Sequence, residues 1–219
     1  MGEICHAPRA AFPAKSTLNE RAGETRIRSV SESILLQTIA ESCAALQSLA
    51  TQQATFSRLA AATVQCLRAG NKVLTCGNGG SGADALHMAE EFIARYRSNR
   101  RSLPSVCLNA DPTVLTCIAN DFGYDAVFAR QVEGLGVRGD LLVCFTTSGN
   151  SVNCLRALTV AKARGLVTIA LLGKDGGLAK GVADFEIIVG HSDTARIQEA
   201  HTLILHALLE VVERAFPAE

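Results

Sequence analysis

Five short runs of apolar residues recur along the chain after residue 71. They are rich in Val, Leu and Ile and do not alternate with polar residues, which is typical of strands that are covered on both faces. The predicted strands are Lys72–Cys76, Ser105–Asn109, Asp140–Thr146, Val167–Leu172 and Phe185–Val189. The pattern therefore predicts a buried sheet of parallel strands.

Segments with helical periodicity separate these runs. They are Ser81–Arg97, Pro112–Ala119, Ala126–Gly134 and Ser151–Arg164, with Ser31–Leu49 and Gln52–Ala69 before the first strand and Thr194–Phe216 at the end. Gly70 and Asn71 supply a stop signal ahead of the first strand. Strands that alternate with helices predict an α/β fold, a doubly wound five-stranded parallel sheet flanked by helices.

The length of 219 residues allows one sizeable α/β domain. We expect residues 1–30 to be a flexible arm, because they hold prolines and scattered charges and no apolar block. Residues 31–219 then form the single domain. The helices that precede and follow this small sheet have more apolar surface than the sheet can cover, which favours burial in a symmetric oligomer.

Charge and cysteine content narrow the class of protein. Lys and Arg number 21, as do Asp and Glu, so nothing favours a nucleic-acid binder. No run approaches eighteen apolar residues, and the first thirty lack the apolar block of a secretory signal. The eight cysteines form no C-x-x-C pair. We interpret them as reduced thiols, mostly in apolar segments (Cys76, Cys107, Cys117, Cys144, Cys154), of a cytoplasmic protein.

Two loops follow predicted strands and precede helices. In Gly77–Ser81, "GNGGS", glycines let the backbone approach a ligand, Ser81 can cap the helix, and exposed N–H groups favour an anion. In Phe145–Ser151, "FTTSGNS", four hydroxyl side chains surround one glycine. A plain glycine turn and an ordinary helix cap are the alternatives. Neither loop has a dinucleotide or Walker pattern, so a small phosphorylated metabolite is favoured.

Two helices carry residues suited to chemistry. His87 and Glu91 are four apart and share a helix face, whereas Glu90 is expected to face elsewhere. Such a pair can bind a metal or serve as a base with its orienting partner, and a simple surface contact is the alternative. Gln198 and His206 lie in the last helix about 12 Å apart at 1.5 Å per residue. If both serve one centre, their side chains converge from two turns apart or a neighbouring subunit supplies one of them. For His206, which lies among apolar residues, a satisfied core histidine is the alternative.

The chain resembles the phosphoheptose isomerases of the sugar isomerase (SIS) domain group from about Ser31 to the C-terminus. The matching blocks are "CGNGGSGADALHMAEEFIARY" (Cys76–Tyr96), "IANDFGYD" (Ile118–Asp125), "TTSGNSVN" (Thr146–Asn153), "LLGKDGG" (Leu171–Gly177) and "DTARIQEAHTLILH" (Asp193–His206). Thr146 stands where the family usually has Ser, and the hydroxyl is kept.

The resemblance implies a homotetramer that converts sedoheptulose 7-phosphate to D-glycero-D-manno-heptose 7-phosphate, with one zinc ion per subunit and active sites at subunit interfaces. The implied zinc ligands are His87, Glu91, Gln198 and His206, and the implied catalytic pair is Glu91 and His206. The implied substrate contacts are Asn78, Gly79, Gly80, Ser81, Asn120, Asp121, Thr146, Thr147, Ser148, Ser151 and Gln198.

The proposed chemistry agrees with the residue types, because ketose–aldose isomerisation needs a base for the carbon proton and an acid/base for the oxygens. Other branches of the group offer two alternatives. One branch binds the bacterial replication initiator and lacks the catalytic pair, and the stretch "LNADPTVLTCIAND" resembles that branch. Another senses a sugar phosphate. The presence of both Glu91 and His206 favours the enzyme.

Overall fold

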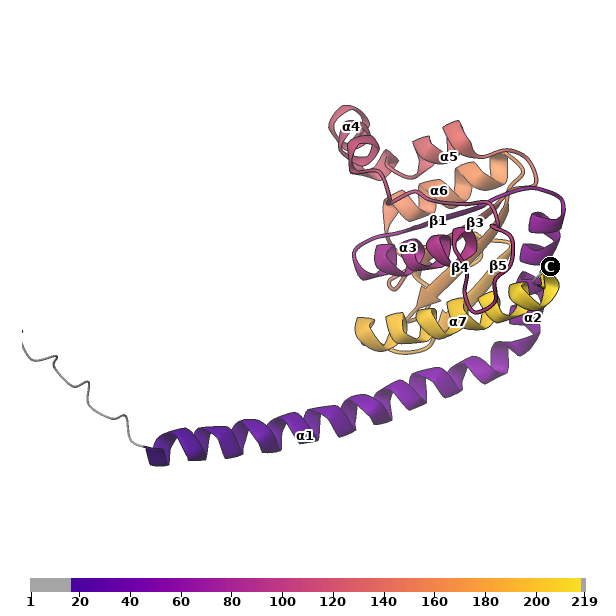
Figure 1. The fold of residues 1–219 in the computed structure, drawn as a ribbon. Helices are drawn as coiled ribbons and strands as arrows, with labels where there is room; N and C mark the ends of the chain where they lie inside the picture. Colours follow the sequence, from indigo (N-terminus) through magenta and orange to yellow (C-terminus); the bar gives the residue numbers. More distant parts are fainter. Residues whose placement is uncertain (1–16, 218–219) are drawn as a thin grey trace, which may run out of the picture. The chain divides into compact units, whose positions relative to one another are not determined.

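The computed structural model describes residues 17–217 (Figure 1). The chain divides into two units, Met1–Ala40 and Glu41–Glu219, which are described separately. Helix α1 (Thr17–Ser48) begins well before the predicted start at Ser31. Residues 1–16 of the predicted arm lie outside the described residues, so its flexibility stays a prediction.

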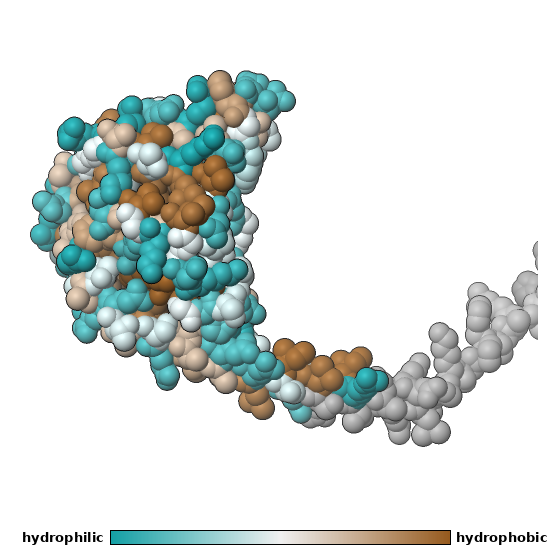
Figure 2. Space-filling model, turned by 180° about the vertical axis from the view of Figure 1, so that it is seen from behind, coloured by the Kyte–Doolittle hydropathy of each residue, from teal (hydrophilic) through white to brown (hydrophobic). Residues whose placement is uncertain are grey.

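Helix α1 exposes apolar side chains in the first unit. They include Ile27, Val30, Ile34, Leu35, Leu36 and Ile39. Figure 2 shows them as a run of brown groups along the described part of the helix.

The second unit contains one sheet of five parallel strands in the order β2-β1-β3-β4-β5. The strands are β1 (Val73–Gly77), β2 (Ser105–Cys107), β3 (Leu141–Thr146), β4 (Val167–Gly173) and β5 (Phe185–Val189). Each lies within two residues of its predicted bounds, so the prediction of a buried parallel sheet is confirmed. In this strand order the chain reverses direction across the sheet between β1 and β3, where open α/β sheets bind ligands.

Helices cover both faces of this sheet (Figure 1). On one face lie α2 (Gln53–Arg68), α3 (Gly80–Ile93) and α7 (Thr194–Ala215); on the other lie α4 (Pro112–Phe122), α5 (Ala129–Leu135) and α6 (Val152–Ala163). Three short 3-10 helices complete the set: η1 (Leu49–Gln52), η2 (Tyr124–Ala126) and η3 (Gly177–Ala179). The doubly wound arrangement is therefore confirmed.

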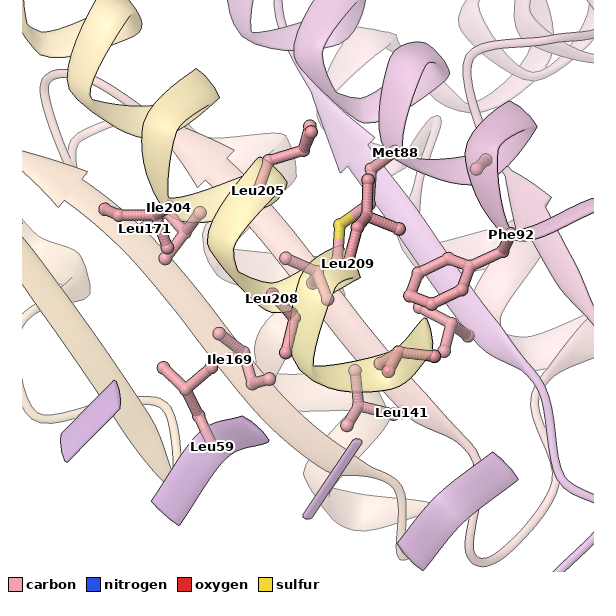
Figure 3. Close-up of a cluster of buried hydrophobic side chains, with 14 of the residues drawn as sticks. Leu59, Met88, Phe92, Leu141, Ile169, Leu171, Ile204, Leu205, Leu208 and Leu209 are labelled. Atoms are coloured by element: carbon pink, nitrogen blue, oxygen red, sulfur yellow. The ribbon is translucent and has the colours of Figure 1, made fainter. Parts of the chain in front are cut away.

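An apolar core joins α3 and α7 to the sheet (Figure 3). Met88 and Phe92 of α3 lie beside Leu205 and Leu209 of α7, and all four are at most 1 % exposed. Full burial of each such side chain stabilises the fold by about 1.5–3 kcal/mol as an upper estimate. This packing holds the two helices against each other.

Helix α3 ends at Ile93, before the predicted end at Arg97. A distant carboxylate holds the segment after it: Glu213 of α7 accepts hydrogen bonds from the backbone N–H of Arg97 (2.9 Å) and of Ser98 (3.1 Å). The helical periodicity of the sequence cannot predict this contact.

The seven cysteines among the described residues are free thiols. Five of them are buried, in agreement with the interpretation as small core residues. Cys117, which was expected in an apolar environment, is instead exposed on α4, as is Cys43 on α1. Among the described residues, no helix is long and apolar enough to cross a membrane.

Candidate active site

The first glycine loop, Gly77–Ser81, follows β1 and is supported by hydrogen bonds to Asn109. Gly79 has φ +56°, a conformation that favours glycine, and α3 begins at Gly80. The predicted cap by Ser81 is wrong, because Ser81 lies buried inside the first turn and makes no capping bond. Asn109 supports the loop instead: its amide donates to the Gly77 carbonyl (2.8 Å) and accepts from the Gly77 N–H (3.2 Å).

Asn78 uses its side chain within the protein. Its amide exchanges two hydrogen bonds with the buried Asn153 (2.9 and 2.8 Å), and its Oδ1 also accepts from the Tyr124 hydroxyl (3.0 Å). Both acceptor sites of Oδ1 are therefore filled. The sequence did not point to Asn153 or Tyr124 as part of this site.

The second loop carries its hydroxyl groups at the end of β3. Thr146 is 4 % exposed, and its Oγ1 has no hydrogen-bond partner among the described residues. Thr147, Ser148 and Ser151 are partly buried beside it. A buried hydroxyl without a partner is costly, and a ligand oxygen at this edge would satisfy it.

The segment Lys174–Gly177, predicted as an ordinary turn, braces the hydroxyl loop. A Cβ on Gly149 would collide with the Gly176 carbonyl, and a Cβ on Gly177 would collide with the Ser148 carbonyl. The loops are further joined by hydrogen bonds from Ala179 N–H to the Gly149 carbonyl (2.9 Å) and from Leu178 N–H to Asn150 Oδ1 (3.0 Å). The two loops therefore form one packed unit.

Helices α3 and α7 run in parallel and meet in three matched pairs. Gly80 lies against the Gln198 side chain, which an added Cβ would strike. One turn on, Thr202 Oγ1 donates to Asp84 Oδ1 (2.9 Å). A further turn on, the rings of His87 and His206 lie edge to face with centroids 5.1 Å apart.

The last of these pairs gathers the titratable groups. His87 Nε2 lies 3.4 Å from Glu91 Oε1, and the Tyr96 ring stacks on His206 with centroids 5.7 Å apart. The expectation that Glu90 faces elsewhere is wrong: ligand atoms of His87, Glu90 and Glu91 all lie within 4.8 Å of one another. An exposed side chain can bend toward its neighbour although its Cβ points about 100° away.

Apart from Asn120 and Asp121, the predicted site residues fall into two groups. The loop group comprises both loops and Gln198, and the helix group comprises His87, Glu91 and His206. Eleven residues separate Gly80 from Glu91, which is about 16 Å along a helix. Gln198, the fourth predicted zinc ligand, lies with the loop group in this chain.

Two further predicted contacts lie on α4. Asn120 and Asp121 are exposed, and the Asn120 amide donates to Asp121 Oδ1 (2.8 Å). The chain continues from them through Gly123 into η2, whose Tyr124 reaches Asn78. Their connection to the first loop therefore runs through Tyr124.

A cavity of about 490 Å³ adjoins the helix group. Its lining includes Tyr96, Thr202 and His206, with the Arg97–Glu210 ion pair (2.8 Å) at its edge. A larger cavity, about 510 Å³, lies between α5 and α6 and contains none of the predicted site residues. The chemistry of the side chains, rather than cavity size, therefore marks the site.

Arg100 fixes the end of α3, which carries Glu91. Its side chain is fully buried, and its guanidinium donates to the backbone carbonyls of Glu91 (2.6 Å), Phe92 (3.0 Å) and Arg101 (2.9 Å). Burial lowers the pKa of Arg100, while nearby Glu213 and Glu91 oppose that shift. No local sequence signal marked this role.

His201, also on α7, serves the core instead. It is fully buried, and its Nε2 lies 3.1 Å from the Leu172 carbonyl, so that nitrogen carries the proton of the neutral ring. Burial lowers the pKa of His201 to about 4, although the hydrogen bond to Leu172 opposes the shift.

Comparison with known proteins identifies the family of the chain. The SIS domain family model matches residues 37–173. The Vibrio cholerae phosphoheptose isomerase is 53 % identical over 146 residues, 66 % of this chain and 76 % of the relative. That of Aliarcobacter butzleri is 47 % identical over 163 residues, 74 % of this chain and 86 % of the relative. The chain belongs to the phosphoheptose isomerase family.

Solved structures of this family share the fold. The phosphoheptose isomerase of Neisseria gonorrhoeae is 39 % identical, with a TM-score of 0.77, and the match covers 84 % of this chain and 98 % of that one. The enzyme from Francisella tularensis is 35 % identical, with a TM-score of 0.74, covering 88 % and 98 %.

Proposed function

We propose that this phosphoheptose isomerase family member converts sedoheptulose 7-phosphate to D-glycero-D-manno-heptose 7-phosphate through an enediol. The observation that supports this best is the convergence of Glu91, His87 and His206 from α3 and α7. A carboxylate and two imidazoles at one place supply the base and the acid that the reaction needs. Glu91 moves the proton between C1 and C2, and His206 serves the two oxygens and ring opening.

The loop group binds the phosphate end of the substrate. Thr146, Thr147, Ser148 and Ser151 offer hydroxyls and backbone N–H groups at the carboxyl end of β3, and the Gly79–Gly80 backbone approaches from β1. Because the Asn78 amide is engaged by Asn153 and Tyr124, its contribution comes from its backbone. Binding energy at the phosphate then positions the sugar chain for reaction.

A zinc ion fits the helix group. The ligand atoms of His87, Glu90 and Glu91 lie within 4.8 Å of one another, and the donors are the imidazole nitrogen and carboxylate oxygen that zinc accepts. We assign His87, Glu91, Gln198 and His206 as its ligands. A bound zinc ion would supply a positive charge that could polarise the substrate carbonyl or hold the ligand side chains in place.

A shared site between subunits explains the separation of the two groups. His87, whose ring contacts the Glu91 carboxylate, lies about 10 Å along α3 from Gly80, and Gln198 lies apart from the other assigned ligands. In the homotetramer that we propose, the helix group of one subunit faces the loop group of another. The reduced thiols are compatible with a cytoplasmic enzyme.

The first experiment is NMR of sedoheptulose 7-phosphate with the purified protein and with Glu91→Gln. We expect aldose 7-phosphate signals from the wild type alone, because Gln keeps the shape of Glu and removes the base. Normal turnover by Glu91→Gln would refute the role of Glu91. A bound but unconverted sugar phosphate would instead favour the non-catalytic alternative, and binding to the replication initiator would be measured next.

Subunit sharing is tested by mixing two inactive variants. Glu91→Gln keeps the loop group, and Thr147→Ala/Ser148→Ala keeps the helix group. If each site combines both groups from different chains, refolding the variants together restores part of the wild-type activity. If the mixture stays inactive while mixed oligomers are shown by mass spectrometry, one chain supplies both groups.

The zinc assignment is tested by measuring the metal content of the purified protein, independently of the proposed activity. We expect about one zinc ion per chain in the purified protein, and loss of that zinc in His87→Ala. Protein that contains no metal and still turns over would refute the assignment of zinc.

A further inference from the structure

The middle contact between α3 and α7 involves Asp84, a residue without a role in the function proposed above. It lies one turn after Gly80 and three residues before His87, on the face of α3 that meets α7. Thr202 Oγ1, one turn after Gln198 and one turn before His206, lies 2.9 Å from its Oδ1. The contact therefore sits midway between the loop group and the helix group.

The second oxygen of Asp84 has a different environment. Oδ2 is buried and has no hydrogen-bond partner among the described residues. A buried acceptor without a partner costs roughly 1–3 kcal/mol, so stability alone gives no reason for a carboxylate here. Because this oxygen is closed to solvent, it is also closed to a substrate. A role for Asp84 must therefore act through the residues around it.

Thr202 is the residue through which Asp84 reaches the site. A hydrogen bond to a carboxylate is stronger than one between neutral groups, and this one fixes how far α7 can slide or rotate on α3. The apolar contacts around it, such as Met88 with Leu209, are not directional and tolerate small shifts. Thr202 Oγ1 also lies 3.1 Å from the Gln198 carbonyl, which offers its proton a competing local acceptor.

We propose that Asp84 and Thr202 are a positioning pair, which sets Gln198 and His206 of α7 against Gly80 and His87 of α3. This inference rests on the proposed isomerase activity of the same site. Misplacement of reacting groups by about 1 Å costs roughly 100-fold in rate. Loss of the pair therefore lowers kcat, while KM changes less because Thr146, Thr147, Ser148 and Ser151, which follow β3 and do not touch the pair, supply most of the proposed phosphate contacts.

The test is a double-mutant cycle with Asp84→Ala and Thr202→Val. Thr202→Val keeps the side-chain shape and removes the hydroxyl, and Thr202→Ser restores the hydroxyl. We expect a loss in kcat of about 10- to 100-fold for each single variant, nearly the same loss for the double variant, and near wild-type kcat for Thr202→Ser. KM stays within about threefold.

The matched control is Thr63→Val in α2. Thr63 is also a helical threonine, and its hydroxyl donates to the Leu59 carbonyl four residues earlier. This variant measures the general effect of replacing a helical threonine and should keep wild-type kcat. Equal kcat for Thr202→Val and Thr202→Ser, or losses that multiply in the double variant, would overturn the proposal.

A second readout does not depend on turnover. The chain has five histidines, so the ring signals of His87 and His206 can be assigned in ¹H–¹³C spectra with single His→Gln variants. We expect both rings to shift in Thr202→Val and to keep wild-type positions in Thr202→Ser. Unchanged rings would overturn the pair even if the wild type is inactive, whereas shifted rings in an inactive protein would remove only the proposed reaction.

Discussion

Gly80→Ala is expected to displace the Gln198 side chain and lower activity while the free energy of unfolding changes little. Gly80 is the first residue of α3, and its φ lies outside the left-handed region, so alanine fits the backbone. The three nearest atoms to an added Cβ all belong to the Gln198 side-chain amide, including Cδ at 2.8 Å and Oε1 at 2.9 Å. The new methyl group can therefore be accommodated only if Gln198 moves.

The magnitudes for stability and activity differ. Alanine stabilises a helix interior by roughly 0.5–1 kcal/mol relative to glycine, and the gain at the first helical position is smaller. A strained rotamer of Gln198 costs roughly 0.5–1.5 kcal/mol. The free energy of unfolding should thus change by less than about 1 kcal/mol. A shift of the Gln198 amide by about 1 Å should lower kcat/KM roughly 100-fold, which equals about 2.7 kcal/mol in the transition state.

The assay combines urea unfolding with initial rates on sedoheptulose 7-phosphate. Gly134→Ala in α5 is the control, because a Cβ there meets no atom within 4 Å; it should gain stability and keep full activity. Gln198→Ala should lose about as much activity as Gly80→Ala, and the double variant should lose little more. Full activity of Gly80→Ala would refute the assignment of Gln198 to the site.

Three further predictions concern other parts of the chain. Burial lowers the pKa of His201 to about 4, so between pH 6.5 and 4 the unfolded chain binds a proton that the folded chain does not. As the pH decreases through that window, the free energy of unfolding should fall by at most about 1.4 kcal/mol per pH unit. Urea unfolding of His201→Gln at several pH values should show a smaller decrease. Arg100→Met removes the donor to three backbone carbonyls, so its free energy of unfolding in urea should be lower by roughly 3 kcal/mol. A variant as stable as the wild type would contradict the assigned contacts. Removal of residues 1–28 should leave the turnover of sedoheptulose 7-phosphate intact, and a large loss would show that the arm has a function.

The sheet and the loops were predictable because their signals are local. Continuous runs of Val, Leu and Ile marked each strand, and the glycines and hydroxyls after β1 and β3 marked the binding edge. Parallel strands place their carboxyl ends at one edge, so both loops could be expected at that edge. Only the structure showed that β1 and β3 are neighbours, with Gly77 beside Phe145. His87 and Glu91 were likewise readable from helical spacing.

The supporting contacts were not predictable because they join residues far apart in sequence. Asn153 reaches Asn78 across 75 positions, and Glu213 binds the backbone of Arg97 from 116 positions away. The Lys174–Gly177 turn gave no sign that it packs on the hydroxyl loop. Ser81 resembled a cap in sequence, but Gly79 takes the capping position because only a residue that tolerates φ +56° fits there.

The parallel course of α3 and α7 has an electrostatic consequence. Each helix carries roughly half a positive charge at its N-terminus and half a negative charge at its C-terminus. Both N-termini point toward the loop end of the pair, where Gly80 meets Gln198, and His87 and His206 lie toward the opposite end. Because the effect fades within one turn, the backbone favours an anion at the loop end and contributes little at His87 and His206, in a chain whose side-chain charges sum to zero.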